Sequence, residues 1–281
     1  MTVAVVTDSG SDLTPAQLDE YKIRQVPLTV SFGEAIYLSP DDLSPEDFWA
    51  KMQTPDCPFP RTAAPSVGLF KRAFEQAFEE GHDGVVYVGL SGGLSATVRN
   101  AQMARDMLPG GRIEIVDSKS ASMGMGALAI RASQMAAAGS SRVEIVEELE
   151  HLRERVVIFV GFDTLDYLHK GGRIGATKAA IGGLLSVKPI MTVEDGIIVP
   201  LDQPRTRARA RARIIELMSD RKATDLYILY SPPMDVAAFR DEVVARLPEP
   251  APEVVTEQFI GPVIGAHVGP GGYGGALVRE F

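Results

Sequence analysis

The sequence predicts an α/β protein in two domains. Short apolar runs alternate with longer amphipathic segments through the first half of the chain, and strands that alternate with helices in this way favour βαβ units and a parallel sheet. The 281 residues are enough for two domains. After Arg142 the pattern changes to a charged helix, a hairpin and a basic helix. We therefore place a domain boundary near residue 157.

The first half contains the clearest alternation of strand and helix patterns. Strands are expected at residues 3–7, 26–32, 84–90 and 112–116, and helices at 13–21, 44–52, 67–81, 94–107 and 121–138. Ser44 followed by Pro45 is a typical helix start, whereas residues 53–66 are rich in proline and threonine and are expected to form a loop. Polar loops follow three of the strands, and in parallel sheets ligands bind outside the carboxyl ends of the strands.

The second half predicts a smaller set of elements. We expect helices at 143–153 and 205–221 and strands at 156–160, 225–230 and 275–279. Residues 185–193 and 197–200 have a hairpin pattern around the turn Asp195-Gly196. Residues 123–129 and 177–185 are mostly apolar. Either segment could line a tunnel, but we favour an ordinary core for most of their residues.

Composition and charge exclude several classes of protein. The formal net charge of −9 argues against a general nucleic-acid binder, which needs a basic excess. The single cysteine, Cys57, allows no internal disulfide, so we expect a cytoplasmic protein. The chain does not open on a secretory signal, and no window approaches the ~18 consecutive apolar residues of a membrane span. Stable membrane insertion is therefore not expected.

Two segments with hydroxyl groups could bind a small anion. Residues 90–97 combine a buried strand, two glycines and a helix start, so backbone amides and the hydroxyls of Ser91 and Ser95 could converge on one anion. The lysine of a P-loop and the GxSxG pattern of serine hydrolases are both missing, which favours a carboxylate that undergoes no chemistry. Thr62 precedes a helix whose expected cap is Ser66, a position that suits an anionic head group or a plain helix start.

Acidic residues and histidines give weaker indications. Asp8 and Asp12 follow the first strand and could hold Mg²⁺, but we favour an Asx turn with a helix cap, for which Asp12 and Thr14 are the candidates. The four histidines lack the spacing of metal ligands, so no metal site is expected. His267 lies among glycines, a pattern that indicates close approach of the backbone to another part of the protein or to a ligand. Both a structural and a functional role are open.

Arginines occupy two positions of interest. Arg173 follows the pair Gly171-Gly172, which is expected to end a helix, and it is either a solvated cation or part of a site. Five arginines alternate between residues 205 and 213, a spacing that spreads their charges around a helix axis. We favour a solvated helix, with an acidic protein partner as the second interpretation. Nucleic acid is disfavoured because no aromatic residues interleave.

Seven segments, taken together, resemble the DegV family. Each is weak alone, but they occur in order over essentially the whole chain. They are Asp8-Ser-Gly-Ser-Asp-Leu13, Thr62-Ala-Ala-Pro-Ser66, Leu90-Ser-Gly-Gly-Leu-Ser-Ala-Thr97, Val116-Asp-Ser-Lys-Ser-Ala-Ser-Met-Gly124, Leu168-His-Lys-Gly-Gly-Arg-Ile-Gly175, Val187-Lys-Pro-Ile190 and Gly261-Pro-Val-Ile-Gly-Ala-His-Val-Gly269.

The resemblance implies a three-layer α/β/α parallel-sheet domain at residues 1–157 and a two-layer α/β domain with a mixed sheet at residues 158–281. A long-chain fatty acid such as palmitate would lie in the cleft between them. The protein would present the acyl chain to a separate fatty-acid kinase, whose acyl phosphate product enters phospholipid synthesis. Neither a cofactor nor a catalytic residue is implied. The alternative is a metal-dependent hydrolase or phosphotransferase acting on acyl phosphates through Asp8, Asp12 and Ser95.

The same resemblance assigns roles to Thr62, Ser95, Arg205 and His267. Ser91 and Arg173 complete the list of candidate ligand-binding residues, although Arg205 and His267 are favoured over Arg173 for the head group. Thr62 and Ser95 would hydrogen-bond the carboxylate, while Arg205 and His267 would serve the exposed head group and the encounter with the kinase. Ala63 and Gly92 stand where the family often has hydroxyl side chains, which leaves Thr62 and Ser95 as the remaining side-chain donors. The Gly171-Gly172 break is expected to turn the chain at the seam between the domains.

Overall fold

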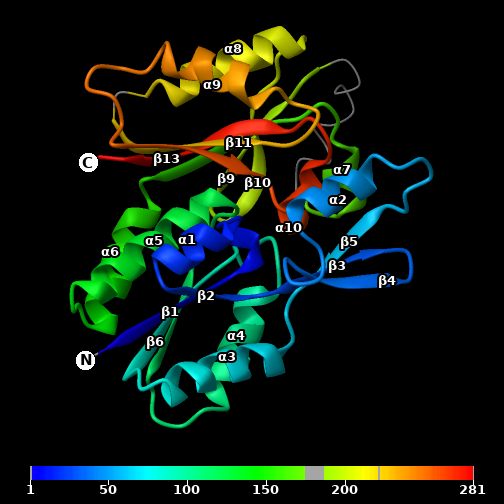
Figure 1. Ribbon diagram of the computed structural model, residues 1–281. Coiled ribbons are helices and arrows are strands. Elements are labelled where there is room, and N and C mark those ends of the chain that lie inside the picture. Colours follow the sequence, from blue (N-terminus) through cyan, green and yellow to red (C-terminus); the bar gives the residue numbers. More distant parts are fainter. Residues whose placement is uncertain (1, 175–186, 221, 281) are drawn as a thin grey trace.

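The computed structural model describes residues 2–174, 187–220 and 222–280 and confirms a mixed α/β fold with one parallel sheet and a separate mixed sheet (Figure 1). Sheet A has four parallel strands in the order β2 (Ile23–Val26), β1 (Val3–Asp8), β6 (Gly84–Gly89) and β7 (Ile113–Asp117). The central strands β1 and β6 are buried along their whole length. Burial on both faces explains why each is a continuous apolar run in the sequence.

Helices cover both faces of sheet A. On one face lie α3 (Val67–Glu79) and α4 (Thr97–Asp106), and on the other lie α5 (Met123–Ala137) and α6 (Arg142–Arg153). The short helix α1 (Pro15–Glu20) adjoins β2. The first half of the chain therefore forms the expected α/β/α layers.

A small antiparallel sheet projects from this domain beside α2 (Pro45–Met52), on the right of Figure 1. Sheet B has the order β4 (Ala35–Ser39), β3 (Leu28–Phe32) and β5 (Pro60–Ala63). The single strand predicted at 26–32 is wrong, because Pro27 separates β2 from β3 and the two strands join different sheets. The loop predicted at 53–66 is also wrong in part, since it contains β5, whose mixed burial gave no alternating apolar pattern.

The second half of the chain builds a six-stranded mixed sheet. Sheet C has the order β10 (Ile197–Asp202), β9 (Ile190–Glu194), β8 (Val156–Gly161), β13 (Tyr273–Arg279), β11 (Ala223–Tyr230) and β12 (Val254–Phe259). Among the described strands of this sheet, only β11 and β12 pair in parallel. The predicted hairpin of β9 and β10 around Asp195-Gly196 is confirmed.

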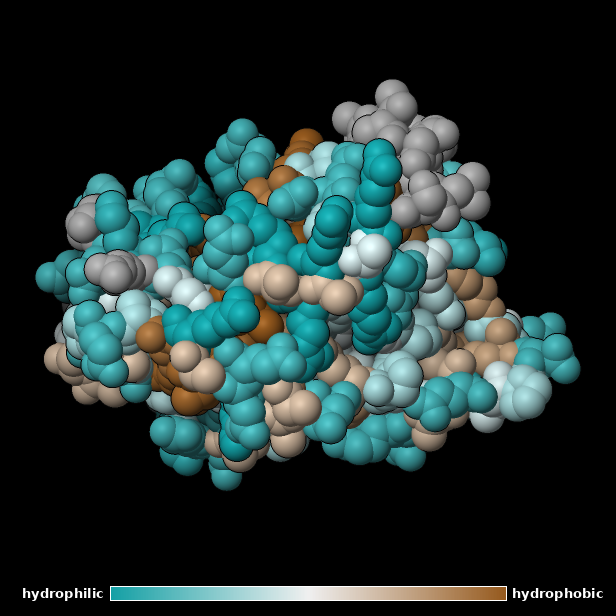
Figure 2. Space-filling view, turned by 90° about the horizontal axis from the view of Figure 1, so that it is seen from above, coloured by the Kyte–Doolittle hydropathy of each residue, from teal (hydrophilic) through white to brown (hydrophobic). Residues whose placement is uncertain are grey.

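Helices α8 (Arg207–Met218) and α9 (Val236–Val244) cover one face of sheet C through a buried apolar layer. Seen from above, the surface over these helices is mostly hydrophilic (Figure 2). Two short helices, α7 (Asp166–Lys170) and α10 (Pro262–Val268), follow β8 and β12. The sequence did not predict α9, α10 or β12, because these short elements give little periodic signal.

The other face of sheet C packs against α5, so one core runs from sheet A through α5 into sheet C. Every described strand of sheets A and B ends by Asp117, and every described strand of sheet C begins at or after Val156. Because α5 and α6 cover sheet A and α6 ends at Arg153, we propose a division just before β8, close to the boundary predicted near residue 157. The apolar segment 177–185 lies outside the described residues. Within the described part of the chain, no helix is long and apolar enough to cross a membrane.

Candidate functional site

An apolar cavity lies between sheet C and the strand ends of sheet A. The empty space between its lining atoms amounts to about 820 Å³ including open solvent, of which about 90 Å³ can hold the centre of a water molecule. Alternate residues along β8 and its continuation, Ile158, Val160 and Phe162, form part of one wall because every second side chain of a strand points to the same face. Residues 123–129 belong to the buried core, as we favoured, and do not line the cavity.

Four polar side chains in the cavity wall form a polar cluster, namely Thr62, Ser95, Arg173 and His267. Thr62 Oγ1 lies 2.9 Å from His267 Nε2. Arg173 Nε donates to the carbonyl oxygen of Leu94, the residue before Ser95, at 3.0 Å. The members come from β5, from the loop after β6, from the segment after α7 and from α10. The fold thus brings together four of the six predicted ligand-binding residues.

His267 is neutral at physiological pH. Burial, and secondly the positive charge of Arg173, lower the pKa of His267 to about 4 because both disfavour the charged imidazolium. Nδ1 is buried and has no hydrogen-bond partner among the described residues, while Nε2 contacts Thr62. A neutral imidazole carries one hydrogen, so the tautomer decides whether Thr62 donates or accepts. The pair of Thr62 and His267 can therefore act as a hydrogen-bond donor or as an acceptor toward a ligand in the cavity.

Arg173 is fixed by carbonyl groups on both sides of the domain seam. Its Nη1 donates to the carbonyl oxygen of Gly171 at 2.7 Å, within the second domain, and its Nε donates to that of Leu94 in the first. A guanidinium group stays charged at all physiological pH values and matches the geometry of a carboxylate. With His267 neutral, the polar cluster carries one positive charge, which suits one monovalent anion.

The glycine loop after β6 binds an anion that belongs to the chain itself. The amide of Gly92 donates to both carboxylate oxygens of Asp117 at 3.2 Å. Ser91 is fully buried, and its hydroxyl donates to the carbonyl oxygen of Gly196, in the β9–β10 turn, at 2.7 Å and accepts from the amide of Gly93 at 3.2 Å. Ser91 does not line the cavity. In this loop only Ser95, whose Oγ lies 2.6 Å from Thr97 Oγ1, offers a hydroxyl there.

Comparison with known proteins fits these motifs. Residues 2–280 match the family model described as "Uncharacterised protein, DegV family". The chain belongs to the DegV family. A DegV domain-containing protein of Halalkalibacterium halodurans is 34% identical over 281 residues, covering 97% of this chain and 96% of the relative. Another from Listeria innocua is 31% identical over 277 residues, with the same coverages.

Solved DegV structures have the same fold. A fatty-acid-binding DegV family protein from Thermus thermophilus is 35% identical with a TM-score of 0.90, and the match covers 100% of both chains. DegV of Bacillus subtilis, described as a fatty acid binding protein, is 30% identical with a TM-score of 0.88 and the same coverage. A stearic-acid-binding protein from Eubacterium ventriosum is 27% identical with a TM-score of 0.89, covering 99% of this chain and 98% of that one.

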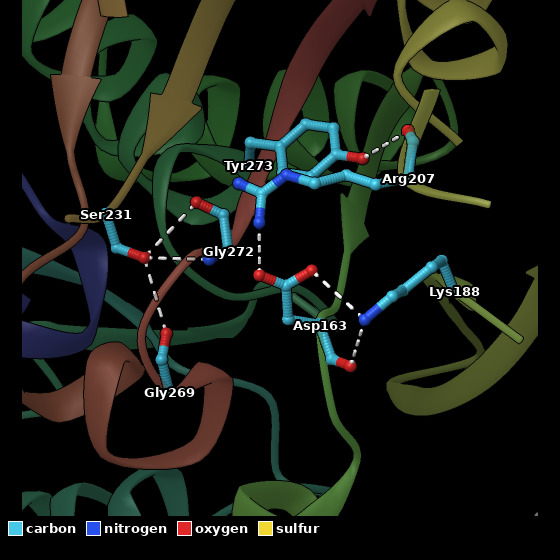
Figure 3. Close-up of polar contacts among 7 residues, drawn as sticks. All are labelled: Asp163, Lys188, Arg207, Ser231, Gly269, Gly272 and Tyr273. Carbon is cyan, nitrogen blue, oxygen red and sulfur yellow. Dashed lines mark hydrogen bonds and ion pairs between the residues drawn. The ribbon is translucent and has the colours of Figure 1, made fainter. Parts of the chain in front are cut away.

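One predicted DegV site residue, Arg205, lies away from the cavity. It is exposed in the turn before α8 and does not line the cavity. Its neighbour Arg207 pairs with the carboxylate of Asp163, which also lies 3.4 Å from Lys188 Nζ (Figure 3). Two later arginines of α8 pair with other acidic residues. These ion pairs favour the solvated-helix interpretation of the arginine run.

The carboxylates of Asp8 and Asp12 accept hydrogen bonds from other groups of the protein. Asp8 accepts from Tyr87 Oη at 2.6 Å and from the amides of Leu90 and Gly10, an Asx turn as expected. Asp12 does not cap α1, a role that belongs to Thr14. Burial raises the pKa of both carboxyl groups. The part of the chain that the structure describes holds no cluster of potential metal ligands.

The glycine-rich turn after α10 approaches protein rather than a ligand. Ser231 Oγ donates to the carbonyl oxygens of Gly269 and Gly272 at 3.3 and 3.2 Å and accepts from the Gly272 amide at 2.9 Å (Figure 3). A Cβ on Gly269 would collide with the ring of Tyr167, and one on Gly271 with Asp163. Close packing around the end of α10 therefore explains these glycines.

Sequence reasoning missed most of the apolar wall. The contribution of α10, through Val263, Ile264 and Val268, had no signal in the sequence because that helix was not predicted. The period-two apolar pattern of β8 could have indicated its wall residues. Two further polar groups of the wall, Ser122 and Thr192, already use their hydroxyls within the fold.

Proposed function

We propose that this DegV protein binds a long-chain fatty acid between its two domains and presents it to a separate fatty-acid kinase. The observation that carries the proposal is the combination of an apolar cavity at the domain seam with the polar cluster in its wall. The Thermus thermophilus and Bacillus subtilis relatives, described as fatty-acid-binding proteins, support the same ligand class. The protein acts in the cytoplasm without a cofactor and without catalysing a reaction itself.

The carboxylate is held by hydrogen bonds and by charge. Thr62 and Ser95 donate from their hydroxyls, and Arg173 balances the negative charge. The neutral His267 ring donates from Nε2 to Thr62 Oγ1, which leaves the Thr62 hydrogen for the carboxylate. The acyl chain lies along the apolar wall. Each buried methylene contributes roughly 0.8 kcal/mol, so a C16 tail supplies ~10 kcal/mol before the cost of association.

Lipid content of the purified protein tests the binding step. Organic extraction and mass spectrometry of protein purified from a bacterial host should recover long-chain fatty acids. Thr62→Val combined with Ser95→Ala should weaken binding at least tenfold, the scale of a hydrogen bond to a charged group. Thr256→Val, on β12 and outside the cavity wall, serves as the matched control. Folded protein without lipid and without fatty-acid affinity would contradict the proposal.

Presentation to the kinase needs its own experiment. With ATP and a bacterial fatty-acid kinase, acyl phosphate should form only when the loaded protein is present. Arg205→Ala should lower the rate of that reaction without changing fatty-acid affinity, because Arg205 is exposed outside the cavity. An unchanged rate would remove Arg205 from the encounter with the kinase.

A further inference from the structure

We propose that Gly171 is the positioning residue of the polar cluster, because its missing side chain leaves the space for the His267 imidazole while its carbonyl oxygen orients Arg173. The proposal rests on the proposed function for its ligand. Gly171 lies directly after α7 and outside the cavity wall. One residue thereby holds two members of the polar cluster, one through its Cα and the other through its carbonyl group.

The glycine at position 171 is not required by the backbone. Its φ of −74° and ψ of −12° lie in the right-handed helical region, which every residue can adopt. Gly172 differs, because its φ is +74°, in the left-handed region that favours glycine. A Cβ added at Gly172 would meet no atom within 4 Å. Glycine is therefore needed at the two positions for different reasons, at 171 for space and at 172 for backbone conformation.

Space at position 171 is limited by His267. A Cβ added to Gly171 would lie 2.9 Å from the imidazole Cε1, closer still to Nδ1, and 2.8 Å from the carbonyl oxygen of Tyr167. The Tyr167 carbonyl cannot easily retreat, since it accepts the Gly171 amide at 2.9 Å within the same helical turn. The imidazole must therefore move. Because its other nitrogen contacts Thr62 at 2.9 Å, that movement breaks the pair of His267 and Thr62.

The same residue determines where Arg173 lies. The carbonyl oxygen of Gly171 accepts from Nη1, and the amide of Arg173 donates to the carbonyl oxygen of Leu168 at 3.1 Å. These bonds close the chain into a tight turn after α7. Arg173 then reaches the first domain through the carbonyl oxygen of Leu94, next to Ser95. A displacement at Gly171 is thus transmitted to both sides of the seam.

Two alanine substitutions at adjacent positions separate this role from simple helix termination. Gly171→Ala should weaken fatty-acid binding at least tenfold and shift the His267 Cε1–H resonance in NMR spectra of the lipid-free protein. Gly172→Ala should lower Tm by roughly 2–6 °C, because alanine is strained at positive φ, and should leave affinity and the His267 resonance unchanged. If Gly171→Ala instead raises Tm by ~1–4 °C, as alanine does at an unstrained position, and retains affinity, the proposal is overturned.

A His267→Ala parent protein keeps the test informative if Gly171→Ala alone does not fold. In a His267→Ala protein the imidazole is gone and only the contact with the Tyr167 carbonyl oxygen remains, so Gly171→Ala should cause no further loss of affinity and a smaller loss of stability than in the unmodified protein. An equal loss in both backgrounds contradicts the proposal. The NMR shift is measured without lipid, so it decides the positioning role separately from the ligand. If the unmodified protein binds no fatty acid while Gly171→Ala still shifts His267, the proposed function fails and the positioning role stands.

Discussion

Asp12 is a buried carboxyl group at the domain interface, and its titration provides a direct test of the interface. Its side chain accepts from Ser122 Oγ at 2.6 Å and from the amide of Gly261, just before α10, at 3.0 Å. Its carbonyl oxygen also accepts from Gln258 Nε2. Burial raises the pKa of Asp12 to about 7, although both hydrogen bonds to the carboxylate act in the opposite direction. Ionised Asp12 is therefore costly in the folded state.

The sign and size of the effect follow from linkage. The folded pKa lies above the ordinary value of ~3.9, so the contribution of Asp12 to stability is complete below about pH 4 and is lost as the pH rises through 7. The loss is ~1.4 kcal/mol per pH unit between pH 5 and the folded pKa and levels off above it, or about 3 kcal/mol in all between pH 5 and pH 8. Little further change is expected from Asp12 above pH 8.

Asp12→Asn should remove this dependence while keeping both hydrogen bonds. The amide oxygen can accept from Gly261, and the amide nitrogen can donate to the Ser122 hydroxyl, which accepts as well as donates. Urea unfolding at pH 5 and pH 8 should therefore show a loss of stability that is about 3 kcal/mol smaller in the variant. Asp41→Asn, at an exposed position, is the control. Equal losses in the wild-type protein and in Asp12→Asn would refute the reasoning.

Three further substitutions test other contacts. Ser91→Ala removes the bond to the carbonyl oxygen of Gly196 and should cost ~1 kcal/mol in urea unfolding and speed fatty-acid dissociation, measured by stopped-flow displacement. Trp49→Phe leaves the carbonyl oxygen of Ile260 without the indole donor at 2.8 Å, which should cost ~1–3 kcal/mol in the same unfolding assay. Gly274→Ala would press a Cβ into the backbone of β8, so circular dichroism should show a protein that unfolds at markedly lower temperature or does not fold.

Local chemistry made much of the fold predictable. Ser44 and Ser66 cap α2 and α3 through their hydroxyls, as their positions indicated, and Asp195-Gly196 forms the expected hairpin turn. These features depend on neighbouring residues only. The break at Pro27 was missed because residues 26–32 read as one apolar run in the sequence. In the structure, the residues on either side of Pro27 join different sheets, β2 in sheet A and β3 in sheet B.

The candidate site was less predictable because it depends on distant contacts. Thr62 and His267 are separated by 205 positions, and only the packing of the second domain onto the first brings them together. The family resemblance named both residues but could not give their mutual contact. The requirement for glycine at position 171 also depends on a distant contact, that with His267. A glycine after a helix normally indicates a left-handed cap, and only the position of α10 shows that Gly171 is needed for another reason.

The carboxylate of Asp117 bears on the proposed binding and release of a fatty acid. It accepts the hydrogen of the Gly92 amide from within the chain, so under the proposed function this part of the loop that carries Ser95 would need no bound ligand to hold its shape. A loop whose amides waited for the cargo would have to fold again at each loading, with an entropic cost that lowers affinity. Under the proposed function, the Ser95 hydroxyl would be in place before the fatty acid arrives, and its release would leave no unpaired amide at Gly92.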